Sequence, residues 1–372
     1  MPIHGNPPFF GSYPGDSTEQ ANSSFFKYFP NSLLGRIPSD TVDDFKQAWL
    51  VRGVGGPMGE VHDLLETLGK RAAVEQNVAP RDVLEAAAFY MADEDNALSF
   101  AYAGWAQCAL PHRRIPIDQP WEVVSGNMRL LVEPGRRPTG KDGEGPMVLA
   151  GVPFGAYPRL ILIYLQTQAL RTNSREVELG NSWRDWMGRI GVSWGGNTGK
   201  AVREQAELLS RCRLTFHIAG NGRTGLVNQS IVDRAIFLDT PQSGRQGRLS
   251  LESAKLSEQF FEALKQHPIP LEESAIRALA NNSAALDAYI WLAYRLRSLN
   301  APRTVTWAAL KAQHGPAYKH LHHFKPDFVK VLAMATAVYP EAKIEVVDQG
   351  VILKPSRPPV APKQIGGKTG HR

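Results

Sequence analysis

The chain has 372 residues, enough for two domains of ordinary size, and its 43% hydrophobic content supports buried cores and excludes global disorder. With 42 Lys and Arg against 36 Asp and Glu, the net charge is +6, which permits nucleic acid, an acidic protein or a membrane surface as a partner without selecting one. Its two cysteines exclude a disulfide-dense secreted scaffold and a four-cysteine zinc site.

The sequence carries no signal for export or for membrane insertion. Residues Met1–Gly5 lack the charged and apolar regions of a signal peptide. The longest apolar run, Leu160–Leu165, is far too short to span a bilayer. We therefore expect a soluble cytoplasmic protein with no membrane partner, in which Cys108 and Cys212 are reduced, buried thiols.

The N-terminal part of the chain changes character near residue 40. Residues 1–40 are rich in Pro, Gly, Ser and Asn and predict a disordered arm. Apolar residues at helical spacing predict helical structure in 41–93, including a helix over Pro80–Met91. Two extended runs follow, 99–110 and 121–132, whose β-branched and aromatic residues favour strands that pair with each other. Residues 134–145 are predicted to form a loop that is basic at its start.

The segment from Pro158 to Leu238 has the element order of a winged helix, in which one helix enters a DNA groove and a β-ribbon lies beside it. The predicted elements are a helix over 159–170, a strand over 176–179, a helix over 182–190, a Gly-rich turn, a second helix from Asn197, and two strands joined by Gly220–Gly222.

A similar order returns nearer the C-terminus. Predicted helices cover 256–266, 271–280, 283–299, 307–313 and 324–338, and predicted strands cover 343–347 and 351–354. An internal duplication is a hypothesis, because the two halves share order and not residue identity. We expect an α+β protein with tandem winged-helix domains, divided into a disordered arm (1–40), an N-terminal winged-helix domain with a helical extension (41–240), a linker (241–250), a C-terminal winged-helix domain (251–356) and a disordered basic tail (357–372).

The helix Asn197–Cys212 is the first candidate recognition helix. One side is apolar, and the other carries basic and polar residues that could reach DNA: Asn197, Thr198, Lys200, Arg203 and Arg211. Arg can read guanine and Asn adenine with two hydrogen bonds, whereas Lys200 suits a phosphate. The alternative is a solvated amphipathic helix, because Glu204 and Glu207 oppose phosphate.

The second candidate interface carries Lys319, Lys325 and Lys330, which suit phosphate, although an ordinary solvated helix would look the same. The nearby histidines do not predict a metal site, because adjacent His322 and His323 point in different directions and no cysteine completes a set. Arg223, at the tip of the 220–222 hairpin, is a further candidate DNA contact.

Two nucleotide-binding motifs are incomplete. Gly195–Lys200 resembles a phosphate loop but follows a helix, and Ala201 replaces the hydroxyl residue that would bind magnesium. Gly220–Gly225 matches a dinucleotide fingerprint but no helix follows it. No catalytic constellation is present, although a site assembled from distant residues would not be visible in the sequence. We expect no enzyme activity and no cofactor.

The chain resembles the plasmid-encoded RepA replication initiators of Gram-negative bacteria over residues 80–360. The phrases that carry the resemblance are Ala101–Arg114, Trp121–Gly126, Tyr157–Leu165, Thr172–Gly180, Ala285–Leu296 and Trp307–Lys311. None of them is a catalytic signature.

The resemblance implies a bacterial, plasmid-associated initiator that binds repeated double-stranded sites at a plasmid origin, helps to open the duplex, and recruits the host initiator and replicative helicase. It also implies tandem winged helices and passage between a monomer and a homodimer that represses its own promoter, which bears on copy control. Alternatives are a winged-helix transcriptional repressor without an origin role, a nucleic-acid enzyme such as a helicase or nicking protein, and a purely structural partner protein.

Overall fold

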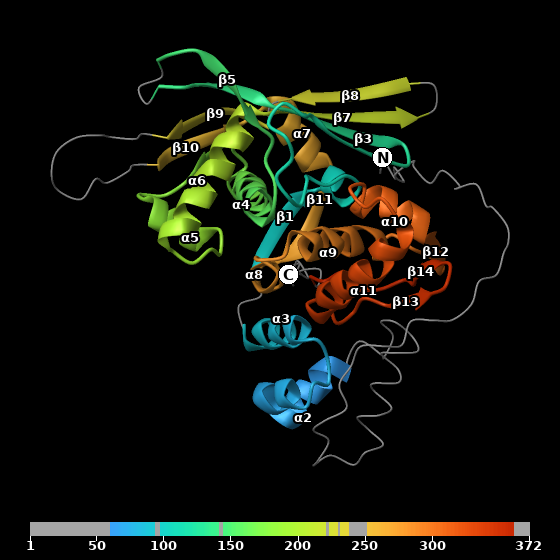
Figure 1. Ribbon diagram of the computed structural model, residues 1–372. Helices are drawn as coiled ribbons and strands as arrows, with labels where there is room; N and C mark the ends of the chain where they lie inside the picture. The colour runs from blue at the N-terminus through green and yellow to red at the C-terminus, as the bar shows by residue number, and fades with distance from the viewer. Residues whose placement is uncertain are drawn as a thin grey trace, which may run out of the picture.

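The computed structural model describes residues 60–93, 97–140, 144–220, 223–229, 231–237 and 251–360 (Figure 1). Within these ranges the protein mixes helices and sheets, which confirms the expected α+β class. No described helix combines the length and apolar character needed to cross a bilayer. The expected arm 1–40 lies outside the described residues, as does most of the expected basic tail.

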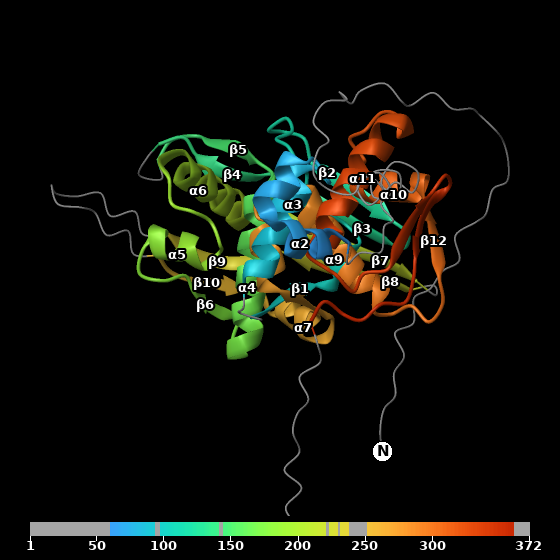
Figure 2. The ribbon, with the colours of Figure 1, turned by 90° about the horizontal axis from the view of Figure 1, so that it is seen from below.

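In the part of the chain that the structure describes, helices α2 (Glu60–Glu75) and α3 (Arg81–Ala92) come before strand β1. Helix α3 forms where the sequence predicts it, and its apolar face, including Val83 and Leu84, is buried. It packs against helices of the C-terminal half, where the Tyr90 hydroxyl donates to Glu272 at 2.9 Å. Figure 2 shows α2 and α3 together on one side of the molecule.

The extended runs near residues 100 and 125 do not pair with each other, so that expectation is wrong. Strand β1 (Leu98–Tyr102) runs into a 3-10 turn (Ala103–Ala106) and pairs with β11 (Pro268–Glu272). The second run is itself a hairpin of β2 (Trp121–Ser125) and β3 (Met128–Glu133). Gly126, with a φ of 59°, supplies the left-handed backbone that the turn requires.

The predicted loop 134–145 also contains structure. Strands β4 (Gly135–Pro138) and β5 (Met147–Gly151) form an antiparallel pair, which we call the basic hairpin because β4 carries Arg136 and Arg137. Its Pro and Gly content is compatible with a short, exposed two-stranded ribbon as well as with a loop.

The first repeated unit runs from residue 156 to residue 256. Its elements are α4 (Ala156–Thr172), β6 (Glu176–Glu178), α5 (Trp183–Arg189), α6 (Gly196–Arg211), β9 (Val232–Phe237) and β10 (Leu251–Leu256). Strand β10 pairs with both β6 and β9, which gives the sheet order β6-β10-β9. The stretch 241–250, expected as a linker, lies outside the described residues, and the strands β9 and β10 that flank it belong to one sheet.

The hairpin predicted at 220–222 is confirmed, but its strands do not join the sheet of the first unit that contains β6. It joins β7 (Arg213–Gly220) and β8 (Arg223–Gln229), which extend β2 and β3 into the sheet β2-β3-β7-β8. The physical reason is burial, because Leu214 and Phe216 of β7 pack into the core on the same face as Leu130 of β3.

The second repeated unit runs from residue 283 to residue 353. After α7 (Glu258–Gln266), β11 and α8 (Glu273–Ala278), its elements are α9 (Ser283–Leu296), β12 (Arg303–Thr306), α10 (Trp307–His314), α11 (Leu321–Ala337), β13 (Ile344–Val347) and β14 (Gly350–Leu353). The sheet order is β12-β14-β13. Apart from β7 and β8, which lie between α6 and β9 and belong to another sheet, both units therefore share one element order, and in both the last strand is central. The predicted helix 271–280 is shorter than expected, because residues up to Glu272 belong to β11, in which Ile269 and Leu271 alternate inward.

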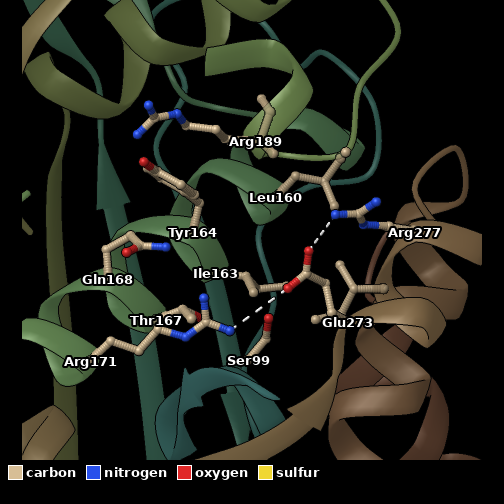
Figure 3. Close-up of a pocket in the computed structure, with 13 residues that line it drawn as sticks. Ser99, Leu160, Ile163, Tyr164, Thr167, Gln168, Arg171, Arg189, Glu273 and Arg277 are labelled. Atoms are coloured by element: carbon tan, nitrogen blue, oxygen red, sulfur yellow. Dashed lines mark hydrogen bonds and ion pairs between the residues drawn. The ribbon is translucent and has the colours of Figure 1, made fainter. Parts of the chain in front are cut away.

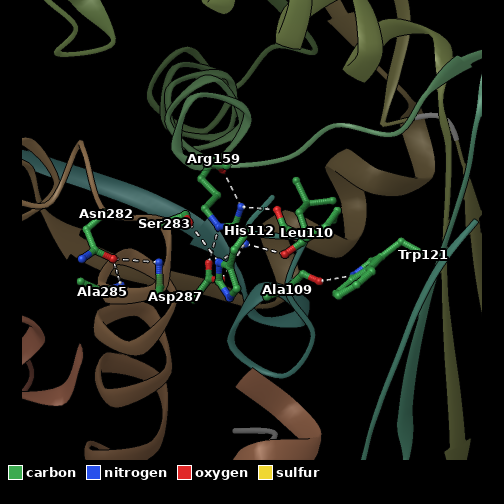
Figure 4. Close-up of polar contacts among 12 residues, drawn as sticks. Ala109, Leu110, His112, Trp121, Arg159, Asn282, Ser283, Ala285 and Asp287 are labelled. Atoms are coloured by element: carbon green, nitrogen blue, oxygen red, sulfur yellow. Dashed lines mark hydrogen bonds and ion pairs between the residues drawn. The ribbon is translucent and has the colours of Figure 1, made fainter. Parts of the chain in front are cut away.

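A buried ion pair joins the first helices of the two units (Figure 4). Arg159 of α4 binds both carboxylate oxygens of Asp287 of α9 at 2.7 Å, and the two side chains are 5% and 7% exposed. The same guanidinium donates to the carbonyls of Leu110 and Gly155, each at 2.6 Å. These bonds fix α4 against α9.

Candidate nucleic-acid interface

Helix α6 presents one apolar and one polar face. Its apolar face, which includes Val202 and Leu209, is buried against the first unit. On the opposite side Asn197, Lys200 and Arg203 are exposed, at a spacing of three residues. A spacing of three places them along one side of a helix with 3.6 residues per turn. The structure therefore brings these predicted residues together, and Thr198 lies beside them, partly buried.

Arg203 is oriented by an aromatic ring. Its guanidinium carbon lies 4.9 Å from the centroid of Trp183, and Trp183 packs edge-on against Trp186 at 5.3 Å. A cation held over an aromatic face loses less conformational freedom when it binds a ligand. The first residue of α5 thus positions the side chain most suited to reading a base.

The acidic residues of α6 are paired within the chain. Glu204 accepts from Arg114 at 2.6 Å, and Glu207 accepts from Arg211 at 3.0 Å and Arg137 at 3.5 Å. Glu204 and Glu207, whose negative charge would repel a phosphate, therefore each lie next to at least one guanidinium. Arg211 is engaged in the same network, since it also donates to the Arg136 carbonyl at 3.1 Å.

The basic hairpin lies beside α6, a feature that the sequence did not reveal (Figure 2). Its close approach depends on Gly135, where any Cβ would collide with the carbonyl of Arg211. Arg136 and Arg137 are exposed next to α6 and extend its basic surface. In the sequence, only the adjacent arginines Arg136 and Arg137 could have indicated that this segment extends a basic surface.

Trp194 is a second residue that the sequence analysis missed. It is 53% exposed immediately before α6, and its ring lies against Gly199 of the first turn. Exposed tryptophan is uncommon and concentrates at binding surfaces. An aromatic residue within a Gly-rich turn was the available signal.

The second candidate interface surrounds the start of α11. Lys319 and Lys330 are exposed, whereas Lys325 is partly buried with its ammonium 5.7 Å from the centroid of Trp307. Lys325 and Lys330 are five residues apart and lie on different sides of the helix, so the structure does not bring the two together. The rings of His322 and His323 are 4.1 Å apart. Among the residues the structure describes, no group of three metal-binding side chains is close enough to hold an ion.

Arg223 belongs to neither of these two helices. Its backbone begins β8 and pairs with Gly220, within the sheet β2-β3-β7-β8. Its side chain lies outside the described part of the chain. Both cysteines are buried thiols, as expected, and burial raises the pKa of Cys108 to about 12.

The molecule is thus an α+β protein with two units of one topology, the first of which carries a basic helix on its surface. Residues 152–309 match the family described as plasmid encoded RepA protein, which confirms the resemblance over that segment. No curated protein matches the chain.

The solved structures that are similar to the chain include two of RctB domains. The crystal structure of selenomethionine derivatives of domains 2 and 3 of RctB has a TM-score of 0.46 and 13% sequence identity, covering 68% of this chain and 97% of the other. A second crystal structure of RctB domains 2–3 has a TM-score of 0.35 and 13% identity, covering 67% of this chain and 95% of the other.

Proposed function

We propose that the chain is a plasmid replication initiator that binds repeated double-stranded sites at its origin through two winged-helix units, 156–256 and 283–353. The observation that carries the proposal is the exposed face of α6, with Asn197, Lys200 and Arg203 in one row. The match of residues 152–309 to plasmid-encoded RepA proteins supports the same role.

In each unit the second helix of the helix pair lies in the major groove, and the paired strands lie beside it. In the first unit Asn197 and Arg203 contact base edges and Lys200 contacts a phosphate. Trp194 packs against the DNA where α6 begins. In the second unit Lys319, Lys325 and Lys330 supply phosphate contacts, which add affinity without sequence preference.

Binding at repeated sites would then open the duplex and recruit the host initiator and the replicative helicase. The chain acts by binding alone, without catalysis or a cofactor, and works in the cytoplasm of a plasmid-bearing bacterium. A homodimer that represses its own promoter is part of the proposal.

The test is binding of the purified chain to fragments of its native plasmid, beside random DNA, across a salt series. We expect tight, salt-steep binding to one repeat-bearing fragment. Trp194 provides an internal probe once the seven other tryptophans are controlled for. The change in tryptophan fluorescence on binding the specific fragment should be smaller in Trp194→Phe than in the wild type.

A plasmid that depends on this origin should also fail to replicate when the chain carries Arg203→Ala. Weak binding that is equal on every fragment would refute the initiator and the sequence-specific reader together. If the wild type binds one fragment specifically but the plasmid replicates normally with Arg203→Ala, the chain would still be a sequence-specific DNA-binding protein. The role of α6 in initiation would then be refuted.

A further inference from the structure

A half-open cavity of about 320 Å³ lies beside α4 (Figure 3). Its walls come from α4, the end of α5, α8 and the start of β1. This volume lies within the range of pockets that hold small molecules. None of the residues proposed to contact DNA lines this cavity.

The charged residues that line the cavity are three arginines and one glutamate: Arg171, Arg189, Arg277 and Glu273. Glu273 is shared, with an oxygen 2.5 Å from Arg277 Nη2 and another 3.8 Å from Arg171 Nη2. Arg189 pairs with Asp185 at 3.1 Å, and Asp185 does not line the cavity. The lining therefore carries more positive than negative charge.

The pairing also holds the arginines in place for a ligand. Arg277 donates a hydrogen bond to Glu273, and Arg171 donates one to the Leu98 carbonyl. Each guanidinium has five N–H donors, more than these contacts use. Side chains that are already ordered lose less entropy when they bind, and guanidinium groups suit the oxygens of phosphate.

The floor of the cavity is apolar. Leu160, Ile163 and Ile190 line it and are buried. Charge interactions are stronger beside a buried apolar surface than in open water. Ser99 and Gln168 add uncharged hydrogen-bonding groups at the wall.

The cavity lies where α8 meets the first unit. Gly191, in the turn between α5 and α6, has a φ of 74°, and a Cβ there would lie 3.2 Å from Cγ of Arg277. Arg277 belongs to α8, which leads into the second unit, whereas Arg171 and Arg189 belong to the first. A ligand held by these arginines would contact the first unit and α8 at once.

We propose that this cavity binds a small phosphate-bearing anion with a charge of −2 or more, held by Arg171, Arg189 and Arg277. This inference goes beyond the proposed function and does not depend on it, because binding of the anion is measured without DNA. A phosphate ester would direct its phosphate to the arginines and its organic part to the apolar floor.

Calorimetric titration of the full chain with inorganic pyrophosphate, at low chloride, tests the site. We expect saturable binding with one site per chain, weakened about tenfold or more by Arg189→Gln and by Arg277→Gln, since each removes a charge-assisted bond. The matched control is Arg184→Gln, which removes an exposed arginine from the same helix α5 outside the cavity and should bind as the wild type does.

Tricarballylate, a tricarboxylate whose charge of about −3 is close to that of pyrophosphate at neutral pH, separates phosphate from general anion binding and should bind at least about tenfold more weakly. Equal binding of the two anions would overturn the assignment to phosphate. Thermal unfolding of each variant shows that the fold is retained, and Arg189→Lys offers a gentler change that should also weaken binding. Absence of binding to the folded wild type, or equal loss in Arg184→Gln, would overturn the proposal. DNA binding is assayed on the same preparations, so that failure of the anion-site proposal can be told apart from failure of the proposed initiator role.

Discussion

Arg203 differs from the other basic residues proposed to contact DNA because an aromatic ring holds it in place, with its guanidinium 4.9 Å from the Trp183 centroid. Lys330, by contrast, is exposed on α11. The contrast between an oriented guanidinium and an exposed ammonium suggests two roles, a base contact for the first and a phosphate contact for the second.

Arg203→Ala should therefore weaken binding to the specific site by about 1–3 kcal/mol and leave random DNA nearly unchanged. Lys330→Ala should weaken both alike and lower the slope of log affinity against log salt by about 1. Fluorescence anisotropy across a salt series measures both quantities. Equal losses on specific and random DNA for Arg203→Ala would contradict its assignment as a base reader.

Buried His314 should make the stability of the folded protein depend on pH. It is buried between Trp291 and Phe328, at ring distances of 5.2 and 4.9 Å. Burial lowers its pKa to about 3. The folded state therefore keeps this imidazole neutral at a pH where the unfolded chain, with an ordinary pKa near 6.5, binds a proton.

Because the unfolded state takes up more protons, the stability contribution of His314 is present above pH 6.5 and falls as the pH is lowered from 6.5 toward 3. His314→Gln should make urea unfolding less sensitive to pH across this window than it is in the wild type. His320→Gln, an exposed neighbour, serves as the control. Parallel pH profiles for the wild type and His314→Gln would contradict the assignment.

At the scale of elements, the contact between the basic hairpin and α6 depends on one missing side chain. Gly135→Ala should cost about 1–3 kcal/mol, because its Cβ meets the Arg211 carbonyl and the hairpin must move. Gly188→Ala in α5, where nothing lies within 4 Å of an added Cβ, should be neutral or stabilise by up to about 1 kcal/mol. Urea denaturation compares the two, and similar stability of both variants would show that the hairpin is not held by this approach.

The helices could be predicted from the sequence and the strand partners could not. The spacing of apolar residues placed α3, α5, α6 and α9 to within a few residues, because helical periodicity is local. Pairing is not local, since β1 meets β11 and β6 meets β10 across long stretches of chain. The wrong assignment of the 220–222 hairpin followed from the same limit, because a hairpin turn says nothing about the sheet that the hairpin joins.

The candidate interface divides in the same way. Asn197, Lys200 and Arg203 follow from the face of one helix, so the sequence was enough to group them. The pairing of Glu207 with Arg137, and the meeting of Arg171, Arg189 and Arg277 at one cavity, bring together separate segments of the chain. Only the folded structure reveals such groupings.

At the scale of the whole molecule, the Arg159–Asp287 pair sets how the two units sit together. Removing one partner leaves a buried charge, so Arg159→Met should destabilise the chain by about 3–5 kcal/mol. The double variant Arg159→Met with Asp287→Leu should recover much of the loss, because neither charge is left alone. Urea denaturation of the three proteins measures this, and a double variant no more stable than the single one would contradict it.

The same buried pair has a consequence for the DNA that the protein can use. If α4 and α9 are fixed to each other, the two helices that we propose to enter DNA grooves are held at a constant rotation about the duplex axis. Inserting about 5 base pairs between the two halves of a binding site would turn one half to the far side of the duplex, and about 10 would return it to the same side. A rigid molecule should therefore respond to such insertions periodically, with a sharp loss of affinity at a half turn and partial recovery at a full turn. Gel-shift titration of a spacer series measures this response.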